Sequence, residues 1–390
     1  MREGQLNNET RDVISQWARW RVYRLTVQEN FPELHAGAKN LISEIRDAAR
    51  FNSNPNQSRT FREFVLQEVT SRVAELLDLK FHREVRLNVA VVLLQLNIVE
   101  AEKEEPAVAY IPAMVPMLQA LGNKDEHLSV KITLVNGLKR ILLESQPSRD
   151  QKNSIAVALL SELESNKSKS TYYWYPMRLV EALGCIDEPS IAKINNNNNP
   201  IEQKPFHVQA LAVAMRDSSL DWLVRAEAAK SLGRVPLQGN VNVALVCHEI
   251  VRLGSDMGKA YNQAPKKFFW QECLWKTYLS FQAEDEIEGR RISGVRPSPL
   301  VTKRSSNQKV VTDAYAQILP LAKHILKQPV EVNGKLVMQS IPDPLLQTVE
   351  KWLKDNQPSS NRITPGLPPL EQRMAVRKSS FPQTVTVGKE

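Results

Sequence analysis

IPAMVPMLQALGNKDEHLSVKITLVNGLKRIL, residues 111–142, contains two amphipathic helical patterns joined by a short polar turn. In each half, apolar residues recur at steps of three and four, which places them on one face of a helix. The turn carries Asp125, and the second pattern opens with Val130 and Lys131. A single two-helix unit of this kind cannot bury its apolar face alone, so the pattern predicts that further units pack against it.

Segments like the second half recur along the chain. Five of them align, and each is preceded by another helical pattern. The alignment stacks leucines at intervals of 45, 45, 49 and 47 residues: Leu93, Leu138, Leu183, Leu232 and Leu279. The longest interval contains the asparagine run 195–199, which we place in a loop. A period in this range is typical of helical arrays, so the sequence predicts an all-α fold, an α-solenoid of about five two-helix repeats.

The turn and the start of the second helix carry a recurring signature. Asp125, Val130 and Lys131 have counterparts in two other units, namely Asp78, Val85 and Arg86, and Asp217, Val224 and Arg225. Two units depart from it, with Tyr175-Pro176 and Gln271-Glu272 in place of Val-Arg or Val-Lys. Over about residues 60–285 the chain resembles HEAT repeats, a family of HEAT/armadillo-like α-solenoids. The resemblance implies that the Asp and basic positions form polar ladders between repeats, and that the second helices line a concave face.

The sequence divides into five predicted segments, the repeats and the regions that flank them. We expect a helical cap at 1–58, repeats at 59–288, a basic flexible loop at 289–310, a helical cap with a hairpin at 311–355, and a disordered tail at 356–390. Asn333-Gly334 between two short alternating runs favours a hairpin near 330–338. The tail is rich in Pro and Ser and poorly periodic, which is typical of disorder.

Composition favours a soluble chain outside the secretory route. Hydrophobic residues make up 42% and charged residues 24%, and the three cysteines are far apart, which indicates reduced thiols rather than disulfides or a zinc site. The N-terminus lacks a basic and apolar signal sequence, and the longest apolar run, Val89–Leu94, is far below the ~18 residues of a membrane span. We expect a cytoplasmic protein, although a domain excised from a longer precursor would look the same.

The positive charge is concentrated in one segment. Residues 1–288 carry a formal net charge of −1, whereas 289–310 carry +6 out of the total of +8. The basic residues of this loop are Arg290, Arg291, Arg296, Lys303, Arg304 and Lys309. Such a run binds phosphates or acidic partners in some proteins, but its Ser, Pro and Gly content favours a solvated loop.

The sequence offers no recognisable enzyme site. Only 14 of 390 residues are Gly, and nucleophile elbows, phosphate-binding loops, dinucleotide fingerprints and HExxH are missing from the sequence. Cys247 and His248 are adjacent, but neighbouring helix residues point about 100° apart, so packing is the better interpretation. We expect no catalytic residue, no metal site and no cofactor.

Tryptophan recurs with the repeat. Trp174, Trp222 and Trp270 are each 48 residues apart and fall near the start of the second helix of three units. With Arg225 and Lys230 they form the predicted partner-binding surface. The alternative, which we favour slightly, is that each Trp fills the junction between neighbouring units.

Two functions fit these features. We expect a non-enzymatic scaffold that binds another protein on the concave face of the solenoid. The alternative is nucleic-acid binding, even DNA-glycosylase-like chemistry, because some HEAT-like solenoids resemble alkylpurine DNA glycosylases and Asp221 beside Trp222 could supply the carboxylate. The N-terminal QWARWRVYRLT mixes aromatic and Arg residues as nucleic-acid-binding segments do, but its apolar stripe favours a capping helix. The sequence does not predict an oligomeric state.

Overall fold

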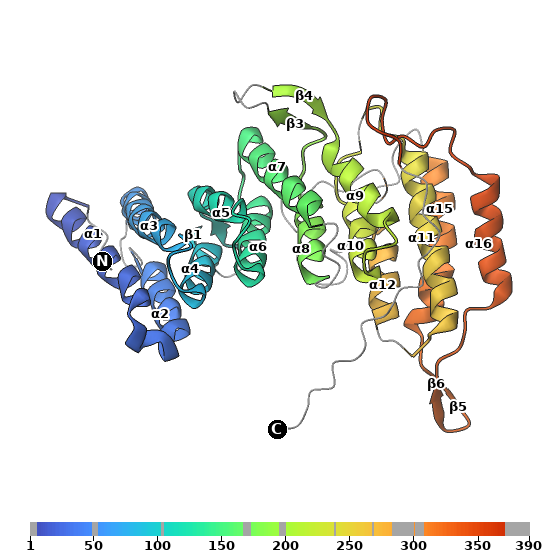
Figure 1. Ribbon diagram of the computed structural model, residues 1–390, viewed down its shortest axis with the longest axis horizontal. Helices are drawn as coiled ribbons and strands as arrows, with labels where there is room; N and C mark the ends of the chain where they lie inside the picture. Colours follow the sequence, from blue (N-terminus) through green and yellow to red (C-terminus); the bar gives the residue numbers. More distant parts are fainter. Residues whose placement is uncertain are drawn as a thin grey trace. The chain divides into compact units, whose positions relative to one another are not determined.

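The chain divides into two compact units. The computed structural model describes residues 6–48, 54–102, 105–166, 173–194, 200–237, 239–266, 269–282, 300 and 308–370. Unit 1 comprises Met1–Ser165, Glu181–Gln203 and Asp285–Arg296, and unit 2 comprises Asn166–Val180, Lys204–Glu284 and Pro297–Glu390. The division crosses a helix inside the predicted repeat region 59–288. The predicted all-α class is confirmed, because helices dominate the described residues (Figure 1).

In unit 1, helices pack mainly against helices that are one or two places away in the sequence order (Figure 1). α1 contacts α3, α2 contacts α4, α4 contacts α6, and α5 contacts both α6 and α7. The bounds are α1 Asn8–Tyr23, α2 Leu34–Arg46, α3 Pro55–Leu76, α4 Arg83–Gln95, α5 Met114–Leu121, α6 Leu128–Glu144 and α7 Arg149–Ser165. Two short 3-10 helices, Arg24–Thr26 and Gln28–Glu33, separate α1 from α2 within the predicted cap 1–58.

Unit 2 repeats this pattern of contacts. α9 contacts α10, α10 contacts α12, α12 contacts α15, and α11 contacts α15 and α16. The bounds are α8 Trp174–Leu183, α9 Phe206–Arg216, α10 Trp222–Leu232, α11 Val243–Gln263, α12 Phe269–Tyr278, α15 Gln308–Leu326 and α16 Asp343–Asp355. α8 is the helix that crosses the division between the units.

The five predicted helix pairs are present as helices. They are α3 with α4, α5 with α6, α7 with α8, α9 with α10, and α11 with α12. All five aligned leucines, Leu93, Leu138, Leu183, Leu232 and Leu279, are buried. The repeating pattern in the sequence therefore marks core positions, as the alignment predicts.

Buried ion pairs join successive helix pairs in unit 1. The Arg86 guanidinium, at the start of α4, donates to both carboxylate oxygens of Glu126 at 3.0–3.1 Å and also to the Phe81 carbonyl. At the equivalent position of α6, the Lys131 ammonium lies 2.9 Å from Glu162. All four charged side chains are buried, so each depends on its partner.

The acidic partners differ from those that the resemblance implies. Asp125 is exposed, and the neighbouring Glu126 pairs with the basic residue instead. Asp78 and Asp217 accept hydrogen bonds within their own turns, from the N–H groups of Lys80 and Ser219. The basic positions therefore form buried links, whereas these aspartates organise turns.

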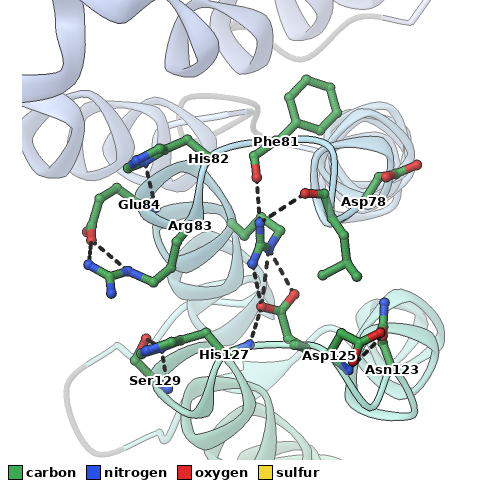
Figure 2. A network of polar contacts seen from close by, with 12 residues as sticks. Asp78, Phe81, His82, Arg83, Glu84, Asn123, Asp125, His127 and Ser129 are labelled. Carbon is green, nitrogen blue, oxygen red and sulfur yellow. Dashed lines mark hydrogen bonds and ion pairs between the residues drawn. The ribbon is translucent and has the colours of Figure 1, made fainter.

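Histidine side chains cap the N-termini of two of the second helices. His82 precedes α4 and His127 precedes α6, 45 residues later, and Figure 2 shows both. In each case Nδ1 accepts the backbone N–H two residues on, from Glu84 at 3.3 Å and from Ser129 at 3.2 Å. This bond satisfies one of the helix N–H groups that lack an intrahelical partner.

Short antiparallel hairpins interrupt the helices. The predicted hairpin is confirmed: β5 Val330–Val332 pairs with β6 Lys335–Val337, and Asn333 and Gly334 have the positive φ values that its two-residue turn requires. β1 Asn97–Val99 pairs with β2 Val108–Ala109. β3 Ile191–Ile194 pairs with β4 Pro200–Lys204. The asparagine run lies between β3 and β4, outside the described residues.

The predicted disordered tail is wrong for its first part. Ile363, Thr364, Leu367 and Leu370 are buried in unit 2. The segment 356–370 is held by backbone groups: the Ile363 carbonyl accepts the Asn242 N–H at 2.7 Å, before α11. The carbonyls of Gly366 and Pro368 accept from Lys204 and Gln209 at 2.9 and 3.2 Å. Residues 371–390 lie outside the described residues.

Candidate aromatic docking surface

The three recurring tryptophans occupy three different environments in unit 2. Trp174, at the start of α8, is 50% exposed and stacks on Tyr173 with ring centroids 4.8 Å apart. Trp222, at the start of α10, is partly exposed. Trp270 in α12 is fully buried. Only two of the three can therefore touch a partner.

Trp270 fills a junction between helices. Its ring lies 5.7 Å from that of Trp222 on α10 and 4.8 Å from that of Phe269. Its indole N–H donates to the Ala264 carbonyl at 2.9 Å, which satisfies the polar atom of a buried ring. The prediction that Trp270 contacts a partner is wrong, and its packing supports the alternative interpretation at this position.

Two contacts hold Trp222 in place at the start of α10. Asp221 precedes α10, and its carboxylate accepts the Leu223 N–H at 2.8 Å, which sets the first turn of the helix. The Arg225 guanidinium lies 4.3 Å from the centroid of the Trp222 ring, a cation–π contact. The indole is therefore rigidly held while part of it stays accessible.

The two basic residues predicted for this surface are buried instead. Arg225 donates to the Met215 carbonyl at 3.0 Å and lies 3.8 Å from the Asp256 carboxylate. The Lys230 ammonium lies 3.8 Å from the Glu227 carboxylate, which also forms an ion pair with Lys276 of α12. Both cations serve the packing of α10, so the prediction that they contact a partner is wrong.

The charge beside the exposed aromatics is negative. Burial raises the pKa of Tyr173, and the carboxylates of Asp221 and Glu272 raise this pKa further. The Glu272 side chain is exposed and lies 3.4 Å from the Lys276 ammonium, one helical turn on. We name Tyr173, Trp174, Asp221, Trp222 and Glu272 the aromatic surface. It combines large rigid rings with carboxylates, which suits a partner segment with apolar and basic side chains.

Sequence reasoning missed two members of the aromatic surface. Tyr173 belongs to the run YYW at 172–174, and Glu272 replaces the basic residue of the repeat signature. Both could have been found by asking which residues flank the recurring tryptophans. The exposed fraction of each ring could not have been predicted from the sequence, because burial depends on neighbouring helices.

The basic loop is almost entirely outside the described residues. The basic residues that lie outside the described residues are Arg290, Arg291, Arg296, Lys303 and Arg304. Lys309 lies in α15, is exposed, and pairs with Asp313 at 2.6 Å, one helical turn on. Lys309 therefore belongs to a helix rather than to a loop.

Cys247 and His248, adjacent in α11, are both buried. Burial raises the pKa of the Cys247 thiol far above its ordinary value, which disfavours the reactive thiolate. The neighbouring His248 ring has its Nε2 atom 3.1 Å from the Leu353 carbonyl of α16. Within the described ranges, no group of three or more His, Cys, Asp or Glu residues is arranged to hold a metal ion.

Among the described helices, none has both the length and the apolar character needed to cross a membrane. Comparisons with protein-family models, with curated proteins and with solved structures found no match to this chain. The resemblance to HEAT repeats therefore rests on the sequence pattern alone.

Proposed function

We propose that this chain is a non-enzymatic HEAT-like scaffold that binds a partner protein. The binding site is the aromatic surface on α8, α10 and α12. In HEAT-like proteins these positions, on the second helix of each repeat, belong to the concave face, and stacked units of this kind provide extended binding surfaces.

The exposed half of Trp174 is the observation that carries this proposal. Exposed Trp and Tyr side chains are rare on surfaces without a partner and are enriched among the residues that dominate binding energies. Here Trp174 is stacked on Tyr173 and Trp222 is fixed by Arg225, so little side-chain entropy is lost when a partner binds.

The charges favour protein over nucleic acid as the partner. The carboxylates of Asp221 and Glu272 raise the pKa of Tyr173, a negative potential that repels phosphates. Three cations of α10 and α12, Arg225, Lys230 and Lys276, are paired with carboxylates, and Lys276 pairs with both Glu227 and Glu272. An acidic aromatic surface of this kind attracts a basic segment of a protein.

Affinity capture with matched variants tests the proposal. The full chain, the Trp174→Ala, Trp222→Ala double variant and Leu336→Ala serve as baits, with circular dichroism to verify folding. Leu336→Ala removes an exposed apolar side chain from the hairpin of the same unit. We expect one or more proteins that the wild type and Leu336→Ala retain and that the double variant loses. A folded double variant that retains every captured protein would refute the proposal.

A further inference from the structure

The outward face of α1 carries apolar side chains that the described part of the chain leaves uncovered. The inward face buries Ile14, Ala18 and Val22, and α1 packs on α3. On the opposite side, Val13 and Trp20 are each 57% exposed. They are seven residues apart and so share one stripe of the helix. An exposed Trp on such a face is typical of a contact surface, because Trp is enriched in the cores of protein interfaces.

Trp20 is positioned for a contact rather than left free. The guanidiniums of Arg21 and Arg24 each lie 5.4 Å from its ring. Arg21 is itself held by Glu44 of α2.

Two unpaired charges flank the apolar patch at opposite ends. Glu9 in the first turn and Arg24 at the C-cap are both exposed and lie on the same stripe as Val13 and Trp20. Neither forms an ion pair with another described residue, and the Arg24 guanidinium lies 5.4 Å from the centroid of the Trp20 ring. The stripe therefore runs from an acidic end, through two apolar residues, to a basic end.

This stripe is complementary to an antiparallel copy of itself. Glu9 and Arg24 are equally distant from the point between Gln16 and Trp17, and so are Val13 and Trp20. A two-fold axis through that point places Val13 opposite Trp20 of a second copy, and Glu9 opposite Arg24 of that copy. A closed two-fold interface needs this self-complementary arrangement.

We propose that the chain forms an antiparallel homodimer through the outward face of α1. The occupant of the patch is a second copy of the same chain, because the charge order of the stripe matches its own reverse. The contact uses one helix from each chain, so it is a weak, reversible one, with a dissociation constant in the range of about 1–100 μM. This inference does not depend on the aromatic surface of unit 2.

Sedimentation equilibrium of the full chain tests the dimer. The wild type is expected to change from the monomer mass toward the dimer mass as its concentration rises through about 1–100 μM. Trp20→Ala should weaken association about tenfold or more, whereas Leu336→Ala, which removes an exposed side chain of unit 2, should not. A wild type that stays monomeric throughout this range, or a dimer that Trp20→Ala leaves unchanged, overturns the proposal.

Charge exchange tests the antiparallel register. Glu9→Arg places two arginines opposite each other at both ends of the contact, and Arg24→Glu places two glutamates there, so each variant alone should lose about tenfold in affinity. The double variant restores opposite charges and should recover wild-type association. An equimolar mixture of the two single variants should form a heterodimer for the same reason. If neither the double variant nor the mixture recovers, the register is wrong. Circular dichroism verifies the folding of each variant, and Glu9→Gln provides a milder second change at the acidic end.

Discussion

At the residue scale, the buried ion pair between Arg86 and Glu126 links two helix pairs of unit 1. Burying both charges costs desolvation energy that the pair recovers only because the geometry is bidentate. Arg86 would remain buried if Glu126 were removed. Its charge would then be buried without a partner, so removing Glu126 is a sensitive test of the link between the two helix pairs.

Glu126→Ala should lower the free energy of unfolding by about 3 kcal/mol, because it leaves a buried guanidinium without its carboxylate. Urea denaturation measures the change. Glu84→Ala is the matched control, since Glu84 forms an exposed pair with the adjacent Arg83 and its loss should cost less than about 1 kcal/mol. Equal losses in the two variants would contradict the structural role given to Glu126.

His207 makes unit 2 sensitive to acid. Complete burial lowers the pKa of this imidazole to about 3, and neither ring nitrogen has a hydrogen-bond partner among the described residues. The unfolded chain takes up a proton at an ordinary pKa of about 6.5, while the folded chain does not. The contribution to stability is therefore complete above pH 6.5 and declines as the pH falls toward 3.

Between pH 7 and pH 5 this one group should remove about 2 kcal/mol from the free energy of unfolding. His207→Leu abolishes that component, so the difference in stability between pH 7 and pH 5 should shrink by about this amount relative to the wild type. Denaturant titrations at the two pH values measure it, with His35→Gln at an exposed histidine as the control. An unchanged pH difference in His207→Leu would show that His207 is not buried as described.

Recurrence alone did not distinguish the environments of the tryptophans. Trp174 and Trp270 occupy equivalent positions of the repeat, yet the first is half exposed and the second is fully buried. Phe269, the Trp222 ring and the Ala264 carbonyl enclose Trp270. These contacts depend on how neighbouring helices pack, so the sequence predicted the positions of the tryptophans and not their exposure.

At the element scale, the helices were predictable and the irregular segments were not. Residues in the helices repeat apolar side chains every three or four positions, a local pattern that the sequence displays directly. β1 and β2 have three and two residues, too few for an alternating pattern. The burial of 356–370 depends on partners far away in the sequence, such as Asn242 before α11. Local composition therefore suggested disorder for a segment that tertiary contacts hold.

Ile363→Ala tests the tail segment. The side chain is completely buried, so removing it should lower the free energy of unfolding by about 3 kcal/mol. Ser359→Ala, at an exposed position of the same segment, should have little effect. Urea denaturation compares the two. If Ile363→Ala matched the wild type in stability, the segment would not be packed against unit 2.

At the scale of the whole molecule, the net positive charge does not describe the aromatic surface. The formal charge of +8 arises mainly in residues 289–310, whereas the exposed rings of unit 2 lie beside Asp221 and Glu272. Nucleic-acid binding through the aromatic surface would require cations there, and Arg225 and Lys230, the two that the sequence predicted for this surface, are buried in ion pairs.

Fluorescence anisotropy with labelled single-stranded and duplex oligonucleotides should therefore show only weak, salt-sensitive binding. At physiological salt we expect dissociation constants no tighter than the ~10⁻⁶–10⁻⁴ M of non-specific binding. Trp222→Ala should leave this residual binding unchanged. Tighter binding that depends on Trp222 would favour the nucleic-acid alternative and justify a glycosylase assay with an Asp221→Asn variant.

Hydrogen–deuterium exchange of the chain, alone and with the protein that affinity capture retains, tests the central claim most directly. Work at a chain concentration below that of self-association keeps α1 out of the comparison. Partner binding is predicted to slow exchange at the starts of α8, α10 and α12, around Trp174, Trp222 and Glu272, while α9 and α11 change little. Protection confined to α9, α11 or unit 1, with none around Trp174 and Trp222, would contradict the proposed docking surface.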